Sequence, residues 1–298
     1  MKSLFPNPQR CRRRSGFSLI EMMITVALLG FIIVGLVAMF SYTQKAFKGG
    51  MNQTDVLEAG RAATELISRE MESITPAQGS TNYLRRDANF YVSQSFEFYQ
   101  QLPPLSGTPA IRTNSFDDVF FITKQNQTWY GQGYLVFPVT NGVGTLYRYQ
   151  WPVAGTNNPA SLILNFYKVA NYARNTGVVG IYSNELRRVT DGIVGLRVQA
   201  CDTNGILVTL ANYNANRPNT IVAFTNKVGV QTFTVFTSNA VPAYVDLELD
   251  ALEQETYEKI RALPPGPPRD NYLQREASRV HVFRRRVTIH NVDVTAYQ

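Results

Sequence analysis

The chain has 298 residues, 44% of them hydrophobic and 17% charged, which is an ordinary globular balance and not that of a disordered tail. Its formal net charge of +7 would suit a nucleic-acid partner, but five basic residues and no acidic residue fall within residues 1–16. The other residues hold 24 basic and 22 acidic side chains, a net charge of +2, so the charge gives no reason to expect a nucleic-acid partner.

The N-terminus combines a basic segment with a long apolar run. Residues 1–16 precede 24 residues, Phe17 to Phe40, in which Glu21 is the only charged side chain. At about 1.5 Å per residue such a helix crosses a bilayer, and the basic segment favours a cytoplasmic N-terminus. A secretory signal would place its small cleavage-site residue after the apolar run, whereas Gly16 precedes it. We expect a leader at 1–16 and a single transmembrane helix at 17–40.

Residues 41–75 predict an amphipathic extension of this helix beyond the membrane. Gly49-Gly50 is expected to interrupt the helix, and a helical pattern resumes at Asn52 and ends near Thr75-Pro76. Apolar residues then recur every three or four positions, which predicts one face that packs on a folded domain. They are Val56, Ala59, Ala63, Leu66, Ile67, Met71 and Ile74.

Residues 76–298 predict a β-rich head outside the cytoplasm. Beyond Gln78, short runs rich in aromatic and β-branched residues alternate with Asn, Gly and Pro, which is typical of an antiparallel sheet. Apolar and polar residues alternate in Tyr244–Leu249, so this strand should have one buried and one solvated face. The expected strands are Asp118–Thr123, Gly133–Val139, Leu146–Tyr149, Leu162–Lys168, Ile193–Ala200, Ile206–Ala211, Thr220–Phe224, Thr232–Thr237, Tyr244–Leu249 and Val280–Asn291.

Between the last two expected strands the pattern changes. Ala251–Leu263 predicts a short helix, and the proline-rich residues 264–268 predict a stiff surface connector. Helices and strands thus occupy separate parts of the chain, so the sequence predicts an α+β fold class with a long N-terminal helix and an antiparallel β-rich head.

Residues 14–21, Arg-Ser-Gly-Phe-Ser-Leu-Ile-Glu, resemble the type IV prepilin motif. The resemblance implies that a prepilin peptidase cleaves after Gly16 and methylates the new N-terminus, Phe17. It implies an assembly role for Glu21, the fifth residue of the mature chain. It further implies a pilin-like fold whose long helix packs on the head, with other pilins or pseudopilins and inner-membrane lipid as partners.

The charge of Glu21 indicates a partner independently of the resemblance. A carboxylate in an apolar helix is costly unless it reaches water or finds a cation. Cleavage after Gly16 would create an ammonium group at Phe17, and in a helical stack of subunits Glu21 of one helix could meet the N-terminus of its neighbour. The alternative is that Glu21 extends to the cytoplasmic headgroups and binds no neighbour.

The order of elements in the C-terminal third is similar to that of the J-type minor pseudopilins of type II secretion and of the W-type minor pilins. Residues 80–160 and 251–278 are insertions relative to the compact head of that family. The resemblance implies a minor subunit that acts in the assembly, or at the tip, of a type IV pilus or a type II secretion filament. The open alternative is an adhesin or other binding module displayed on a pilin-like anchor.

The sequence predicts no catalytic residue, no cofactor and no metal site, so an enzyme is not expected. We recognise no pattern for a nucleophile paired with a base, for a cluster of metal ligands or for a phosphate-binding loop. His281 and His290 are expected on opposite faces of the last strand, where they could not ligate one metal ion. Asp117-Asp118 is interpreted as the start of a strand and not as a calcium site.

Two further features have a structural and a functional interpretation. Arg284-Arg285-Arg286 with Arg279 could bind DNA or an anionic partner, but alternation along the last strand favours a charged, partly exposed strand. Cys11 lies in the leader, so the processed chain would keep only Cys201 and could form no internal disulfide. We expect Cys201 to be a small buried residue, with an intermolecular bridge or lipid attachment as the alternative.

Overall fold

The computed structural model describes residues 16, 18–77, 88–102, 112–140, 142–154, 159, 162–209, 221–226 and 231–297. The chain divides into two compact units, Met1–Met51 and Asn52–Gln298. Helix α1 (Leu19–Glu72) begins in the first unit and ends in the second. The long apolar helix followed by an antiparallel sheet confirms the α+β fold class and is consistent with a pilin-like fold.

In the first unit α1 runs without interruption and exposes its apolar side chains. Every described residue up to Met51 is exposed, and Leu19 and Phe31 are 80% and 81% accessible. The expected interruption at Gly49-Gly50 was wrong, because both glycines are helical. Glycine keeps its backbone N–H, so the hydrogen-bond ladder continues, at a cost of about 1 kcal/mol per glycine relative to alanine.

In the second unit the Asn52–Glu72 part of α1 is amphipathic, as predicted. Its buried face comprises Val56, Gly60, Ala63, Thr64, Ile67, Ser68 and Met71. Ala59 and Leu66 were expected on this face but are exposed. Small or hydroxyl-bearing residues, Gly60, Thr64 and Ser68, are buried on it instead. The helix ends at Glu72, before the predicted Thr75-Pro76.

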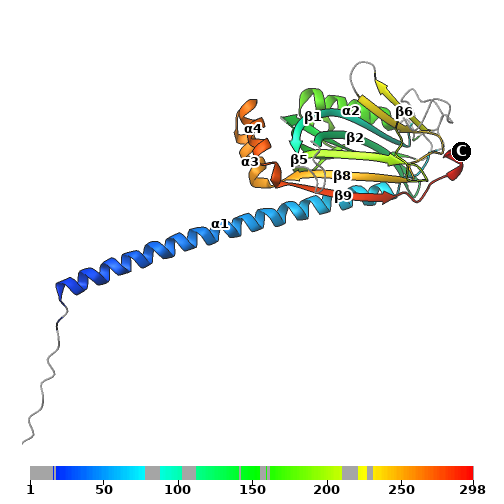
Figure 1. Ribbon diagram of the computed structural model, residues 1–298. Helices are drawn as coiled ribbons and strands as arrows, with labels where there is room; N and C mark the ends of the chain where they lie inside the picture. Colours follow the sequence, from blue (N-terminus) through cyan, green and yellow to red (C-terminus); the bar gives the residue numbers. More distant parts are fainter. Residues whose placement is uncertain are drawn as a thin grey trace, which may run out of the picture. The chain divides into compact units, whose positions relative to one another are not determined.

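The second unit contains one sheet of nine described strands in the order β6-β7-β1-β2-β3-β4-β5-β8-β9 (Figure 1). Neighbouring strands are antiparallel, and β2 also pairs once with β5 in parallel, at Phe116 and Leu196. The bounds are β1 Phe90–Leu102, β2 Arg112–Gln125, β3 Thr128–Thr140, β4 Val143–Ala154, β5 Leu186–Cys201, β6 Ile221–Asn226, β7 Gln231–Phe236, β8 Tyr244–Leu252 and β9 Val280–Thr288.

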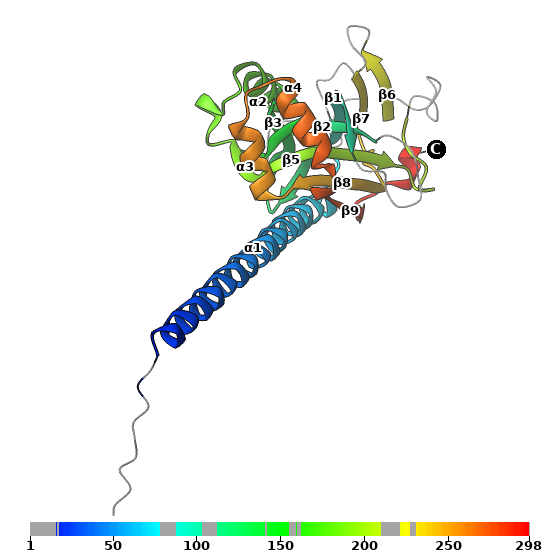
Figure 2. The same cartoon turned by 60° about the vertical axis from the view of Figure 1, so that its left-hand side comes forward.

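The core forms two main layers against the sheet. One cluster joins Ala63, Ile67 and Met71 of α1 to strand residues that include Leu196 and Leu247. A second cluster joins helix α2 (Leu162–Thr176), through residues such as Phe166, to Phe120 and Tyr149. A smaller cluster includes Ile260 of α3 (Gln254–Ala262) and Leu273 of α4 (Pro267–Arg275), which lie beside each other (Figure 2).

Two of the expected strands were wrong, and one strand was missed. Leu162–Lys168 lies in α2, whose buried residues Leu162, Ile163, Phe166, Val169, Ala170 and Ala173 have helical spacing. Residues 206–209, the described part of Ile206–Ala211, contribute only an isolated bridge between Cys201 and Leu207. Strand β1 was not predicted, although Phe90, Tyr91 and Val92 are buried in it.

The C-terminal elements begin and end differently from the prediction. The expected helix at Ala251–Leu263 begins only at Gln254, because Ala251 and Leu252 belong to β8. The predicted proline connector contributes the first turn of α4, with proline at its first positions. There the missing proline N–H costs no helical hydrogen bond, so the helix tolerates it. Strand β9 ends at Thr288, three residues before the predicted Asn291.

Candidate functional site

The predicted processing segment lies at the start of α1. The backbone N–H of Glu21 donates to the carbonyl oxygen of Ser18 at 3.0 Å and lies 3.4 Å from its Oγ. Ser18 is therefore the residue that caps the helix, and the Ser-x-x-Glu spacing was a sequence signal for this start. Gly16 is exposed and has no atom within 4 Å of the position that a Cβ would take. Phe17 lies outside the described residues.

Glu21 lies in the first turn of α1, where its negative charge is favourable to the helix dipole. Its side chain is exposed among exposed apolar neighbours such as Ile20 and Met22. The described residues 16 and 18–44 contain no lysine or arginine, so this part of the helix offers Glu21 no ion pair. A cationic partner for Glu21 would therefore have to come from outside this described segment.

The apolar part of α1 has the composition of an anchor. Within the described residues, α1 is the one helix long and apolar enough to cross a membrane, by length and composition, and its most apolar stretch is wholly unburied. An exposed apolar surface of this size needs an apolar environment. These features fit a membrane-anchored protein with a globular head.

Residues 11–37 match the family model for the prokaryotic N-terminal methylation motif. The match supports a type IV prepilin-like protein, and it implies processing by prepilin peptidase and assembly with other pilins in general. The proteins of this family are structural and not enzymatic. No curated protein and no solved structure matches the chain.

A second candidate surface is the charged face of β5, β8 and β9 that points away from α1. Arg197, Glu248 and Arg284 form one row across the three strands, and Gln199, Asp246 and Arg286 form the next. The two rows line a surface hollow of about 420 Å³. Alternating charge across neighbouring strands stabilises such rows.

The arginine triplet is held by carboxylates within the second unit. Arg284 contacts Glu248 at 2.6 Å, and Arg286 makes a bidentate contact with Asp246 at 2.7 Å. The hydrogen bonds from Arg286 lower the pKa of Asp246 below its usual value. Arg285 points to the opposite face and pairs with Glu65 and Glu72 of α1. Each arginine therefore has a carboxylate partner within the second unit, which the sequence did not predict, and DNA binding itself stays untested.

Asp117 and Asp118 were expected at the start of a strand, but this was wrong. They are buried in the middle of β2. The carboxylate of Asp117 accepts hydrogen bonds from Ser115 Oγ at 2.5 Å and from the backbone N–H of Val198 at 2.8 Å. Burial raises the pKa of Asp117 to about 7, although these hydrogen bonds by themselves would lower it. Asp118 pairs with Arg174 of α2, and burial raises its pKa to about 6.

The histidines and Cys201 were the other residues considered as metal ligands or reactive groups. His281 lies on β9, with Nε2 3.5 Å from Glu253, whereas His290 lies beyond the end of the strand, contrary to the prediction. No cluster of three or more potential metal ligands occurs among the described residues. Cys201 is 2% exposed, which confirms that it is buried, and burial raises the pKa of its thiol.

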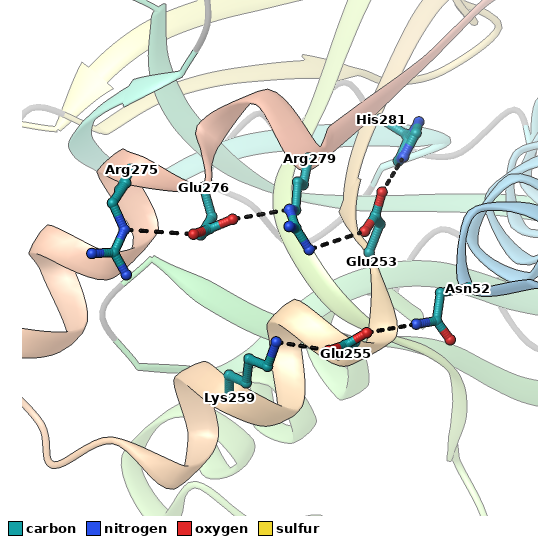
Figure 3. Close-up of polar contacts among 8 residues, drawn as sticks. All are labelled: Asn52, Glu253, Glu255, Lys259, Arg275, Glu276, Arg279 and His281. Carbon is teal, nitrogen blue, oxygen red and sulfur yellow. Dashed lines mark hydrogen bonds and ion pairs between the residues drawn. The ribbon is translucent and has the colours of Figure 1, made fainter. Parts of the chain in front are cut away.

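A polar network that the sequence did not predict ties α3 and α4 to the rest of the second unit (Figure 3). Arg279 lies between Glu276 and Glu253, at 2.9 and 3.7 Å, and Glu253 also approaches His281 of β9. In a separate branch, Glu255 accepts a hydrogen bond from Asn52 at 2.9 Å. The 251–278 insertion is thus attached to both β9 and α1. Glu276 and Arg279 are three residues apart, but sequence spacing gave no signal for the pairings of Glu253 and Glu255, because their partners lie far away in the chain.

Proposed function

We propose that the chain is a minor subunit of a type IV pilus or type II secretion filament, where it acts in assembly or at the tip. The proposal rests on one observation: the methylation motif at 11–37 leads directly into an exposed apolar helix. The large second unit favours a minor subunit, similar to the J-type pseudopilins or W-type pilins, over a small repeating one. The chain then needs no catalytic residue or cofactor.

The proposal assigns a place to each part of the chain. Residues 1–16 are a cytoplasmic leader, 17–40 a single transmembrane helix, 41–75 its amphipathic extension and 76–298 a periplasmic or extracellular head. Prepilin peptidase cleaves after Gly16 and methylates Phe17, and Glu21 holds the subunit in register with its neighbours. The basic leader supports this orientation, since positive charge is retained on the cytoplasmic side.

Mass spectrometry of the N-terminal peptide, from chain made in a cell that has prepilin peptidase, tests the processing. We expect a mature N-terminus at Phe17 that carries one methyl group. A Gly16→Leu variant should keep its leader, because the open space around Gly16 allows folding but the bulkier residue blocks the cut. An N-terminus after the apolar run would mean ordinary signal-peptide removal and would contradict the proposal.

Co-purification from membranes separates the filament subunit from a displayed adhesin. A filament subunit should co-purify with other prepilin-like proteins, and its deletion should stop filament formation or secretion. A displayed binding module should be dispensable for both.

A further inference from the structure

Strand β9 is an outer edge of the described sheet, since it pairs with β8 alone. The N–H of Ile289 donates to the carbonyl oxygen of Ala243 at 3.0 Å, which sets the phase of the β8–β9 ladder. In an antiparallel pair, alternate residues direct both backbone groups to the partner strand. The backbone N–H and C=O groups of Phe283, Arg285 and Val287 therefore point to β8. Those of Val282, Arg284 and Arg286 point outward, away from the sheet.

These outward groups have no hydrogen-bond partner among the residues that the structure describes. A row of free donors and acceptors on an edge strand is a template for a further strand. The arginine side chains on this strand are 52% and 56% exposed at positions 284 and 286. The edge is thus accessible to another chain.

The charge rows indicate what kind of strand would fit. Along the first row the side chains alternate from Arg197 through Glu248 to Arg284, and the second row ends with Asp246 and Arg286. Both rows end on arginine at the edge. Continued alternation requires a carboxylate on the next strand beside each of these two arginines.

The same arginines argue against a second copy of this chain as the added strand. Antiparallel pairing of two β9 strands about their central residue, Arg284, would bring the arginines at 284–286 of one copy opposite those of the other. Like charges directly opposite each other destabilise a strand pair, so the triplet protects β9 from pairing with itself.

On its other face, an added strand would meet a groove of about 930 Å³ between α1 and β9. Its lining mixes apolar and charged side chains and includes Leu57, Ala62 and Phe283. The groove suits apolar residues that alternate with the acidic ones, because side chains of a strand point to opposite faces in turn.

We propose that β9 is a docking edge for an extended segment of a different protein, in which acidic residues facing Arg284 and Arg286 alternate with apolar residues facing the α1–β9 groove. The partner adds one antiparallel or parallel strand to the sheet. The inference goes beyond the filament role and does not depend on processing at Gly16, since it concerns the second unit alone.

Fluorescence anisotropy of a labelled peptide of alternating valine and glutamate, titrated with the purified full chain in detergent, tests the proposal. The matched control peptide has lysine in place of glutamate. The arginines at the ends of the two rows attract the glutamates of one peptide and repel the lysines of the other. We therefore expect the acidic peptide to bind about tenfold more tightly.

Two variants separate the backbone and charge contributions. Val282→Pro removes one outward N–H, at an edge position where proline leaves the β8 ladder intact, and should weaken the acidic peptide about tenfold. Val282→Ala is its control and should bind as the wild type does. The Arg284→Gln/Arg286→Gln variant keeps the backbone but leaves Glu248 and Asp246 without these arginines, so it should lose or reverse the preference for the acidic peptide, and circular dichroism checks folding.

Equal binding of both peptides to the wild type would overturn the proposal. Unchanged affinity in folded Val282→Pro would do the same, because it would place the peptide elsewhere. Analytical ultracentrifugation that shows dimers abolished by Val282→Pro would identify a second copy as the occupant and would also contradict the inference.

Discussion

Asp117 shows how one buried carboxylate links a strand pairing to pH. It lies beside the single parallel pair between β2 and β5, at Phe116 and Leu196. Its carboxylate accepts a hydrogen bond from the backbone N–H of Val198, just beyond this pair. Asp118 of the same strand, Arg197 and Ser115 are the other polar or charged groups that act on it. Burial dominates, so the folded protein holds a proton on Asp117 more tightly than the unfolded chain does.

Asp117→Asn should therefore stabilise the protein at neutral and alkaline pH. With the folded pKa raised from 3.8 to about 7, the unfolded chain ionises first, and the free energy of unfolding falls as the pH rises from about 4 to about 7. One pKa unit corresponds to about 1.4 kcal/mol. The variant should remove up to about 4 kcal/mol of this fall, measured by urea unfolding in detergent between pH 4 and pH 8.

Asp118→Asn is the matched comparison, because it changes the neighbouring carboxylate, whose pKa burial raises to about 6, and removes the ion pair with Arg174. By the same linkage it should also raise stability at pH 7, but by less than Asp117→Asn does. If Asp117→Asn left stability at pH 7 unchanged or lowered it, the assignment of burial as the dominant effect at Asp117 would be wrong.

At the scale of elements, α1 and β9 approach closely at Gly60 and Phe283. A Cβ on Gly60 would lie 2.1 Å from the Phe283 ring, so only glycine allows this contact. Farther along, Glu70 of α1 accepts a hydrogen bond from Tyr134 Oη at 2.5 Å and pairs with Arg148 at 2.5 Å. The Asn52–Glu72 part of α1 is thus held to the sheet by an aromatic contact and by a polar one.

Gly60→Ala should lower the free energy of unfolding by about 1–3 kcal/mol, as expected of an overpacked contact, although alanine is the better helix former. The smaller side chain in Gly60→Ala/Phe283→Leu should recover part of that loss. A double-mutant cycle by urea unfolding measures the coupling between the two positions. Additive effects would show that the ring moves aside freely and that the close approach does not constrain α1.

At the scale of the whole molecule, the described part of the first unit is mainly a helix whose apolar surface remains exposed, while the second unit buries a core of its own. Such a helix requires lipid or other helices around it. Glu21 is then an ionisable group in an apolar environment, without a cation among the described residues near it. The proposed partner is the ammonium group of Phe17 in a neighbouring subunit.

Glu21→Val tests that pairing. The variant should insert into the membrane and be cleaved after Gly16 as the wild type is, since valine suits the lipid better than a carboxylate does. It should be incorporated poorly into filaments, because the partner ammonium loses its counter-ion. Crosslinking yield to other pilins, at equal membrane levels, is the measurement, and an unchanged yield would support the alternative in which Glu21 only reaches the headgroups.

The sequence by itself determined the features that depend on local pattern. A single charged residue in 24 predicts an apolar helix, the spacing of Val56, Ala63 and Ile67 predicts the buried stripe of α1, and alternation in Tyr244–Leu249 predicts a half-buried strand. The motif around Gly16 is likewise contiguous. These signals need no partner elsewhere in the chain, so they can be recognised without a fold.

Only the tertiary structure decided the features that depend on distant partners. Leu162–Lys168 has strand-forming residues, and its helical spacing becomes apparent only over the longer segment Leu162–Thr176, which the packing of Phe166 on Phe120 and Tyr149 holds against the sheet. Asp117 became a buried residue because β5 supplies the Val198 N–H, and the arginines at 284–286 found carboxylates on β8 and α1. The contribution of a polar residue depends on which groups surround it, and those groups come together only when the chain folds.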